Sequence, residues 1–249
     1  MPYLTSRKAL GQHELVDLDV LQTILMAAAI TKSDKVFEAG AGSGELTEKL
    51  SKTARRLVAY ELDKRLFPAL EARFYQHDNI EIINGDAFTS NDKFDIFVSN
   101  LPYSQSRRFI EWLVTKKFKR AVVTVQREFA EKLNAAPSSR NYRSVSVLAR
   151  SRFQLDVIAQ VDKKAFRPIP KVDATIVRII PHDNNVVLPE TVKALNLLFS
   201  YRRKRLSRVI SNFSPKLIDY SELREERVAS LKPEILFRLA TEISKQESH

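Results

Sequence analysis

"KVFEAGAGSGELTEKL", residues 35–50, is the segment of this 249-residue chain that most strongly indicates its fold. An apolar run that includes Val36 and Phe37 precedes a glycine-rich turn, and a helix-forming segment follows it, so the stretch predicts a strand, a loop and a helix. Glycines let backbone N–H groups approach a ligand closely, as in nucleotide-binding folds. A dinucleotide fingerprint needs a small residue at position 45, where the chain has Glu45. A simple NAD-binding loop is therefore disfavoured.

Acidic residues follow the next two predicted strands. "RLVAYEL" places Glu61 21 residues after Gly40, where a carboxylate can accept hydrogen bonds from both ribose hydroxyls of an adenosine cofactor. "IEIINGDAF" brings Asp86 to the same sheet edge, within reach of an adenine amino group. Each signal is weak alone. Together with the E-x-G-x-G-x-G motif they resemble the S-adenosylmethionine site of a class I methyltransferase; the motif residues are Glu38, Gly40, Gly42 and Gly44.

A fourth predicted strand, "FDIFVS", leads into Asn100, Leu101, Pro102 and Tyr103. The amide oxygen of Asn100 and the backbone carbonyl of Leu101 can each accept one hydrogen of an exocyclic amine, which orients its nitrogen. Pro102 stiffens the turn, and Tyr103 offers a face on which a base can stack. In isolation this tetrapeptide would be better explained as a proline turn with a buried tyrosine; after a methyltransferase cofactor motif, we expect a catalytic segment.

With "NLPY" in this position, the chain resembles the KsgA-type ribosomal RNA small-subunit adenine dimethyltransferase family along nearly its whole length. Four further segments are similar to that family: "SRKALGQHELVD", "VQREFAEKLNAAPSSRNYRSVSVLARSRF", "AFRPIPKVDATIVRI" and "LFSYRRKRLSRVI". The last of these looks like the family's basic C-terminal helix. The resemblance implies transfer of two methyl groups from S-adenosylmethionine to adenosines of small-subunit rRNA.

The resemblance also implies roles for individual residues. The implied cofactor contacts are His13, Leu15, Gly40, Glu61, Asp86 and Asn100. The target adenine would be clamped between Tyr103 and Phe166 and held by Asn100. Two positions depart from the family pattern: Glu14 stands where phenylalanine is usual, which puts the N-terminal cofactor contacts in doubt, and Thr175 stands where serine is common, which keeps the hydroxyl.

Charge is unevenly distributed. The net charge is +11, and residues 104–181 contain 17 Lys and Arg against 6 Asp and Glu, which favours a polyanionic partner. Helical periodicity leaves basic residues for phosphates in two places, although solvated helix faces are the plain alternative. The candidates are Arg107, Arg108, Lys116 and Lys117 in the first place and Arg202, Arg203, Lys204 and Arg205 in the second.

The predicted fold is α/β: a Rossmann-like class I methyltransferase with a seven-stranded mixed sheet and a small C-terminal all-helical domain. Residues 1–181 form the methyltransferase domain, with an N-terminal extension and helix over 1–30. Residues 186–249 form a small helical RNA-binding domain, for which a packing appendage is the alternative.

Composition excludes some classes. The chain has no cysteine, so it has no disulfide or thiolate chemistry, and its four histidines are too scattered to suggest a metal site. "VLQTILMAAAI" is too short to span a membrane. We therefore expect a cytoplasmic protein that binds neither metal nor membrane. The family resemblance implies the small ribosomal subunit or its rRNA as partner, and we expect the protein to be a monomer.

Other functions remain open at this level. A resistance-type adenine methyltransferase of large-subunit rRNA shares the fold but tends to have isoleucine where Leu101 stands. A non-catalytic ribosome-assembly factor could keep the fold, although Glu61, Asp86, Asn100 and Tyr103 are intact. A DNA adenine methyltransferase is the weakest alternative.

Overall fold

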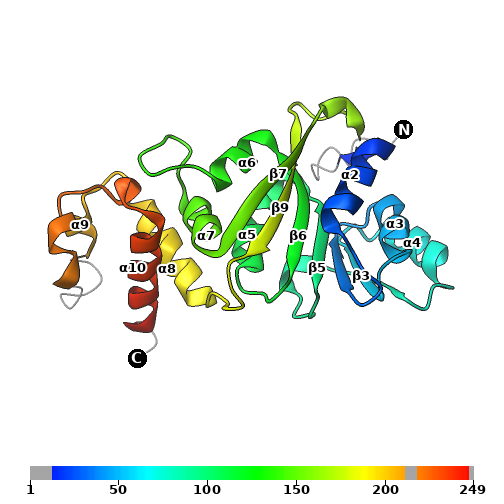
Figure 1. Cartoon of the computed structure of the whole chain (residues 1–249), viewed down its shortest axis with the longest axis horizontal. Coiled ribbons are helices and arrows are strands. Elements are labelled where there is room, and N and C mark those ends of the chain that lie inside the picture. The colour runs from blue at the N-terminus through cyan, green and yellow to red at the C-terminus, as the bar shows by residue number, and fades with distance from the viewer. Residues whose placement is uncertain (1–12, 211–217, 247–249) are drawn as a thin grey trace. The chain divides into compact units, whose positions relative to one another are not determined.

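The computed structural model describes residues 13–210 and 218–246 (Figure 1). Its main sheet has seven strands in the order β4-β3-β2-β5-β6-β9-β7. In chain order the strands are β2 (Lys35–Ala39), β3 (Arg56–Glu61), β4 (Ile80–Asn84), β5 (Ile96–Asn100), β6 (Arg120–Gln126), β7 (Phe153–Val161) and β9 (Ala174–Pro181). All seven strands predicted from the sequence are confirmed.

The sheet is mixed, as predicted. Strands β4, β3, β2, β5 and β6 are parallel to one another, and β9 is antiparallel to β6. The chain moves outward from β2 through β3 to β4 and then returns to β5 on the other side of β2. Ligands of open α/β sheets bind at the carboxyl ends of the strands, where the strand order reverses in this way. The ends of β2, β3 and β5 therefore mark the expected site.

Helices alternate with the strands and then continue alone to the C-terminus. The α-helices are α2 (Leu18–Ala28), α3 (Glu45–Ser51), α4 (Phe67–Phe74), α5 (Ser106–Leu113), α6 (Arg127–Leu133), α7 (Ser144–Arg152), α8 (Pro189–Ser200), α9 (Leu206–Ile210) and α10 (Pro233–Gln246). The 3-10 turns are η1 (Ala87–Thr89), η2 (Tyr103–Gln105), η3 (Lys163–Ala165), η4 (Ile218–Leu223) and η5 (Val228–Ser230). Within the described ranges, no helix has both the length and the apolar character needed to cross a membrane.

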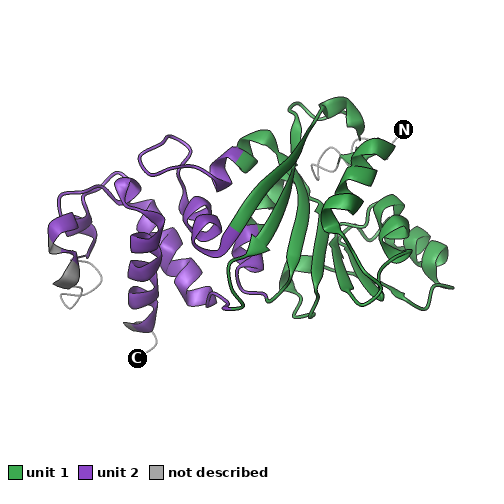
Figure 2. Cartoon of the chain, in the orientation of Figure 1, with its two compact units in different colours: residues 1–109, 117–130, 154–184 green, residues 110–116, 131–153, 185–249 purple. Residues whose placement is uncertain are grey.

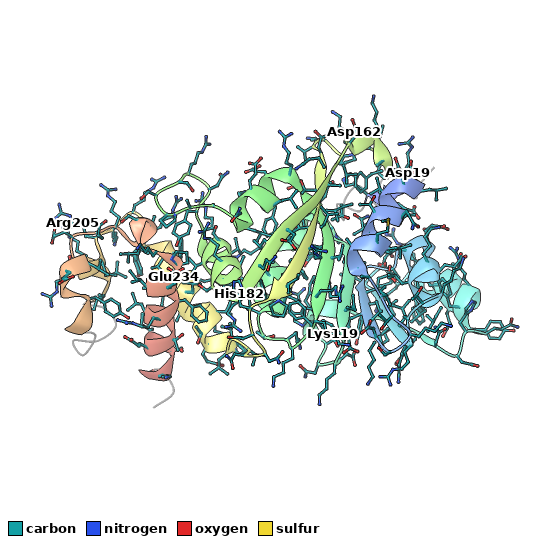
Figure 3. All side chains as sticks on the ribbon, viewed as in Figure 1. Asp19, Lys119, Asp162, His182, Arg205 and Glu234 are labelled. Carbon is teal, nitrogen blue, oxygen red and sulfur yellow. The ribbon has the colours of Figure 1, made fainter. Side chains whose placement is uncertain are left out.

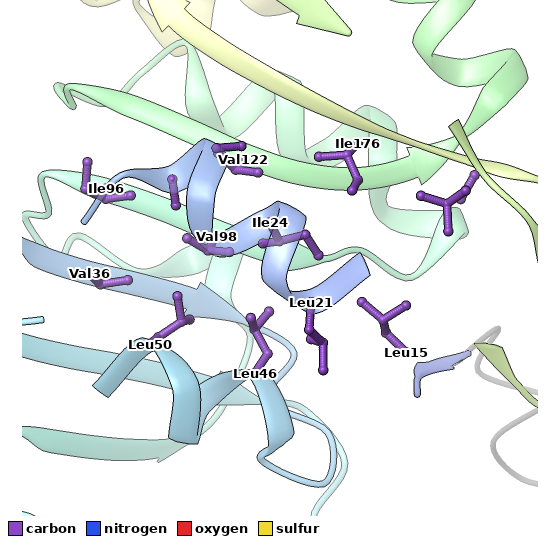
Figure 4. Packing of buried hydrophobic residues seen from close by; sticks show 14 of the residues in the cluster. Leu15, Leu21, Ile24, Val36, Leu46, Leu50, Ile96, Val98, Val122 and Ile176 are labelled. Carbon is purple, nitrogen blue, oxygen red and sulfur yellow. The ribbon is translucent and has the colours of Figure 1, made fainter. Parts of the chain in front are cut away.

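The period-two alternation of the central strands divides the core into two layers. Val36 of β2 and Val98 of β5 belong to an aliphatic cluster with side chains of α2 and α3, which Figure 4 shows from close by. The alternate positions bear aromatic rings: Phe37 stacks on Phe97 at 5.7 Å, and Phe97 stacks on Phe109 of α5 at 4.9 Å. Because both faces of β2 are covered, its position and that of the loop after it are fixed from both sides.

A second, two-stranded sheet joins distant parts of the chain. β1 (Glu14–Leu15) pairs antiparallel with β8 (Phe166–Arg167), with Leu15 opposite Phe166. The backbone N–H of Val16 also donates to the carbonyl of Ala165 at 2.9 Å. Two-residue strands have no alternation to detect, so this sheet was not predicted from the sequence.

The chain divides into two compact units, coloured separately in Figure 2. Unit 1 comprises residues 1–109, 117–130 and 154–184, and it contains nearly all of both sheets. Unit 2 comprises residues 110–116, 131–153 and 185–249. The domain limits expected from the sequence, 1–181 and 186–249, stay a prediction, because compactness alone does not define a unit that folds or functions separately.

Unit 2 has a helical interior. The hydroxyl of Tyr142 donates to the carbonyl of Leu231 at 3.0 Å, and the Tyr142 ring meets Phe199 of α8 edge-on at 5.6 Å. Thr191 of α8 and Ser244 of α10 share a buried hydrogen bond of 3.0 Å between their hydroxyls. The helices of the C-terminal region are thus tied to one another by buried polar contacts as well as apolar packing.

The basic segment that was expected to form one C-terminal helix is interrupted by a turn in the structure. α8 ends at Ser200 and α9 begins at Leu206, so the basic residues 202–205 lie in the turn between them. The backbone of this turn bonds to residues 226–229: the N–H of Ala229 donates to the carbonyl of Arg202 at 3.0 Å, and the N–H of Leu206 donates to that of Glu226 at 2.8 Å. These bonds replace helical ones, which explains the interruption.

Candidate active site

A hollow of about 800 Å³, its open mouth included, lies where the sheet order reverses. The predicted site residues that line it are His13, Leu15, Glu38, Gly40, Gly42, Glu61, Asn100, Leu101, Pro102 and Tyr103. Three predicted site residues are outside its lining: Gly44, Asp86 and Phe166.

The glycine loop after β2 forms one wall of the hollow. Gly40 has φ +79° and Gly42 has φ +60°, a backbone region that side-chain-bearing residues rarely adopt. A Cβ added to either would meet no protein atom within 4 Å, so the space beside them is open to a ligand. Gly44 differs, because its Cβ would lie 2.8 Å from Cε2 of Phe74. The third glycine therefore serves packing between α3 and α4, and the expected cofactor contact is not supported by the lining.

Glu61 ends β3 and is almost completely buried, with 2% of its surface exposed. Its Oε2 accepts a hydrogen bond from the backbone N–H of Gly42, and its Oε1 accepts one from Asp63, both at 2.8 Å. Each carboxylate oxygen can accept two hydrogen bonds, so one further acceptor position remains on each. The carboxylate is thus held in place with capacity for two hydroxyl donors, as predicted for a ribose.

Glu38 is buried in the wall of the same hollow without a partner. It is 1% exposed, and neither carboxylate oxygen has a hydrogen-bond partner. Burial, together with the nearby charge of Glu61, raises the pKa of Glu38 to about 8, and the Thr47 hydroxyl, which forms no hydrogen bond of normal geometry, offsets only part of this rise. The carboxyl is therefore protonated near neutral pH, and a cation bound beside it would favour release of that proton.

Asn100 joins the catalytic segment to the N-terminal strand. Its Nδ2 donates to the backbone carbonyl of His13 at 2.8 Å, and the ring Nδ1 of His13 donates to the carbonyl of Pro168 at 2.7 Å. Because Nδ2 is engaged, the amide oxygen of Asn100 is the group left to accept a hydrogen bond. The backbone N–H of Leu101 donates to the carbonyl of Thr124 at 3.2 Å, which anchors the next residue of the segment.

The two aromatic residues expected to clamp the target base differ in position. Tyr103 lines the hollow, and its hydroxyl is buried without a partner; burial and the charge of Asp173 raise its pKa to about 12. Phe166 is fully buried in the aliphatic cluster, opposite Leu15 in the small sheet. Apolar packing places its ring in the core, so the clamp formed by both rings stays a prediction.

Asp86 caps η1 outside the lining of the hollow. Its Oδ1 accepts a hydrogen bond from the backbone N–H of Phe88 at 3.0 Å, and its Oδ2 lies 2.6 Å from Nη1 of Arg108. Arg108 was expected to face phosphates. In the structure it is paired with the carboxylate predicted to bind adenine.

Sequence reasoning missed parts of the site. Glu45 lines the hollow although it was not predicted as a site residue. Glu14, noted from the sequence as a departure that bears on the N-terminal cofactor contacts, lines it too, so four acidic side chains surround the hollow, with Glu38 and Glu61. The position of Glu45, next in sequence to the last glycine of the loop, was a signal that could have identified it. Pro168, whose carbonyl holds His13, gave no signal because the small sheet was not foreseen. The site thus has a more acidic lining than predicted.

The other predicted RNA-binding residues have varied surroundings. Arg107, Lys117, Arg203 and Lys204 are exposed, and Lys116 lies over the Trp112 ring at 5.1 Å. Arg205, labelled in Figure 3, pairs with Glu225. Burial and the charges of Arg143 and Arg203 lower the pKa of Arg202. Among residues 13–210 and 218–246, no three His, Asp or Glu side chains form a group that could hold a metal ion.

Known proteins similar to this chain share an activity class. The sequence matches the family described as ribosomal RNA adenine dimethylase over residues 3–245. A probable ribosomal RNA small subunit methyltransferase A of Pyrococcus abyssi is 38% identical over 202 residues, which are 81% of this chain and 74% of that relative. The ribosomal RNA small subunit methyltransferase A of Borreliella burgdorferi is 35% identical over 216 residues, 84% of this chain and 77% of that relative.

Two solved structures are similar along most of the chain. A dimethyladenosine transferase from Plasmodium falciparum has a TM-score of 0.78 and 27% identity, with 94% of this chain and 98% of that chain covered. The 23S rRNA methyltransferase ErmE has a TM-score of 0.64 and 24% identity, with 92% of this chain and 99% of that chain covered. The second likeness supports the Rossmann-like fold alone.

Proposed function

Because this chain belongs to the ribosomal RNA adenine dimethylase family, we propose that it transfers two methyl groups from S-adenosylmethionine to the exocyclic amine of adenosines in small-subunit rRNA. The observation that supports this most directly is the hollow at the carboxyl ends of β2, β3 and β5, where Glu61 and the Asn100–Tyr103 segment lie together. Relatives named for small-subunit rRNA favour that substrate over large-subunit rRNA.

The residues of the hollow fit S-adenosylmethionine. Glu61 has two acceptor positions for ribose hydroxyls, and Gly40 and Gly42 leave open space beside the backbone. The unpartnered Glu38 carboxyl would balance the cationic part of the molecule by losing its proton on binding. When bound, S-adenosylmethionine supplies an electrophilic methyl group on a sulfonium. His13 and Leu15 also line the hollow and complete the proposed contacts.

The Asn100–Tyr103 segment would orient the target amine. An adenine amino group has two hydrogens, for which Asn100 Oδ1 and the Leu101 carbonyl are the acceptors, so the nitrogen lone pair faces away from both. Both oxygens stabilise the positive charge that develops on nitrogen, and the proton is lost only after nitrogen has become acidic. Tyr103 holds the base by stacking. No strong general base is required by this scheme.

The second methyl transfer uses the same residues with one hydrogen fewer. A monomethylated amine donates to only one of the two acceptors, Asn100 Oδ1 or the Leu101 carbonyl. Stacking on Tyr103 must then contribute more to holding the base. We place this activity in the cytoplasm and propose that the protein acts as a monomer, with basic residues of 104–117 and of the C-terminal helical region bound to rRNA phosphates.

The test is methyl transfer from labelled S-adenosylmethionine to purified small subunits that lack adenine dimethylation, with large subunits and duplex DNA in parallel. Digestion to nucleosides should give dimethyladenosine from small subunits alone. Asn100→Ala should abolish it, whereas Asn184→Ala, at an exposed position outside the hollow, should not. Label in large subunits or DNA instead would refute the proposed substrate. Binding of small subunits without methyl transfer would refute the proposed enzymatic activity.

A further inference from the structure

Arg108 is the residue whose contacts differ most from its expected role. Its Nη1 lies 2.6 Å from Oδ2 of Asp86. The other oxygen of that carboxylate, Oδ1, is bonded to the backbone N–H of Phe88 at 3.0 Å. Since Oδ1 accepts a hydrogen bond and Oδ2 is in ion-pair contact with Arg108, rotation of the carboxylate plane would weaken one of the two contacts. Arg108 therefore takes part in setting the direction in which Asp86 presents its remaining lone pairs.

The guanidinium of Arg108 is itself held in place. Its Cζ lies 5.8 Å from the centre of the Phe88 ring, a geometry suited to a cation over an aromatic face. The Phe88 ring in turn lies 6.1 Å from that of Phe109, which is fully buried. Although 44% of the Arg108 side chain is exposed, it is supported from one side by the core.

The ion pair between Arg108 and Asp86 joins two segments that are expected to form the site. α5 begins at Ser106, directly after the turn that contains Tyr103, so Arg108 lies in the first turns of the helix that follows the methyl-acceptor segment. Asp86 lies outside the lining of the hollow; it begins the turn after β4, at the sheet edge where the sequence predicts the adenine of the cofactor. The ion pair therefore links the segment that holds the target amine to the segment that holds the cofactor's base.

We propose that Arg108 is a positioning residue that orients Asp86 to accept a hydrogen bond from the exocyclic amine of the cofactor's adenine; this inference rests on the proposed function. The carboxylate has four acceptor positions; the Phe88 N–H occupies one on Oδ1, and Arg108 contacts Oδ2 as an ion pair. An adenine amino group can donate to a remaining position. The 6-oxo group of hypoxanthine cannot donate, so Arg108 contributes to selection of adenine through Asp86.

The experiment is isothermal titration of the full-length protein with two probes, S-adenosylhomocysteine and S-inosylhomocysteine. Wild type should bind the adenosyl compound more tightly. Arg108→Gln should raise its Kd about fivefold, as expected for loss of a supported, half-exposed ion pair, and should leave the Kd of the inosyl compound nearly unchanged. Arg108→Lys, which keeps the charge but not the planar fork, should recover part of the preference.

Two further variants serve as controls. Arg55→Gln makes the same change at an exposed arginine just before β3, outside the lining of the hollow, and should behave as wild type. Asp86→Asn should reduce the preference by itself, and adding Arg108→Gln to it should change nothing further, because both act through one contact. Thermal unfolding of each variant checks that the fold is retained.

The outcomes separate the inference from its premise. An equal loss of affinity for both probes in Arg108→Gln would make Arg108 merely structural and overturn the inference. Tighter binding of S-adenosylhomocysteine by that variant would mean that Arg108 competes with adenine for Asp86, which also overturns it. If wild type binds neither probe under any condition, the proposed function itself is wrong.

Discussion

Replacing Glu38 by glutamine should change how the stability of the protein depends on pH. The carboxyl is 1% exposed, has no hydrogen-bond partner, and has a pKa raised from 4.5 to about 8, chiefly by burial. Between about pH 4.5 and 8 the folded protein keeps this proton whereas the unfolded chain releases it. Stability must therefore fall as pH rises through that window, and Glu38→Gln removes this fall.

The size of the effect follows from the shift. One pKa unit corresponds to about 1.4 kcal/mol, so a rise from 4.5 to about 8 amounts to at most about 5 kcal/mol over the full window. We expect the free energy of unfolding of Glu38→Gln, relative to wild type, to increase by several kcal/mol between pH 5 and pH 8. A change of even about 2 kcal/mol would be easily measured by denaturation.

The assay is guanidinium-induced unfolding at four pH values from 5 to 8 and constant ionic strength, followed by circular dichroism. Glu45→Gln is the matched control, since it introduces the same amide at an exposed position of the same hollow. Parallel pH profiles for wild type and Glu38→Gln would refute the reasoning. A second sign of the buried proton is its release when a cationic cofactor binds at pH 7, measured by calorimetry in buffers of different ionisation enthalpy.

Other substitutions test single contacts. Tyr103→Phe should keep methyl transfer near wild type, because the hydroxyl has no hydrogen-bond partner. Tyr103→Ala should reduce kcat/KM tenfold or more, because it removes a stacking free energy on the order of 1–3 kcal/mol. Gly44→Ala should lower the free energy of unfolding by about 1–2 kcal/mol, since φ is +89° and the new Cβ would lie 2.8 Å from Phe74; a denaturation midpoint equal to wild type would contradict this. Tyr142→Phe should lower stability by about 1 kcal/mol by leaving the Leu231 carbonyl unpaired, measured as a lower Tm with unchanged cofactor affinity.

The sheet was predictable because its signals are local. Each strand is a short apolar run bounded by turn residues. The glycine loop, Glu61 and Asn100 come at the ends of three such runs, β2, β3 and β5, whose carboxyl ends meet at one edge of the sheet. The same logic located most of the hollow's lining. Glycine positions also had a physical basis, although the sequence could not distinguish open space beside Gly42 from the Phe74 contact of Gly44.

The features that the sequence did not predict depend on contacts between distant segments of the chain. The pairing of Leu15 with Phe166, which buries the ring expected to face the target base, has no sequence signal in two-residue strands. The interruption of the basic helix arises from bonds to residues 226–229, and the pairing of Asp86 with Arg108 from the approach of two turns. Hydrophobic periodicity describes one segment at a time, so it does not predict which distant segments contact each other.

The small sheet also has a consequence for synthesis of the protein. His13, which lines the hollow, donates to the carbonyl of Pro168, a residue 155 positions later in the chain. At translation rates of about 5–20 residues per second, the N-terminal segment waits roughly 8–30 s before its partner has been made. The nascent chain therefore cannot hold His13 in this position until shortly before β9 is translated, so the wall of the hollow that His13 forms is completed only late in synthesis.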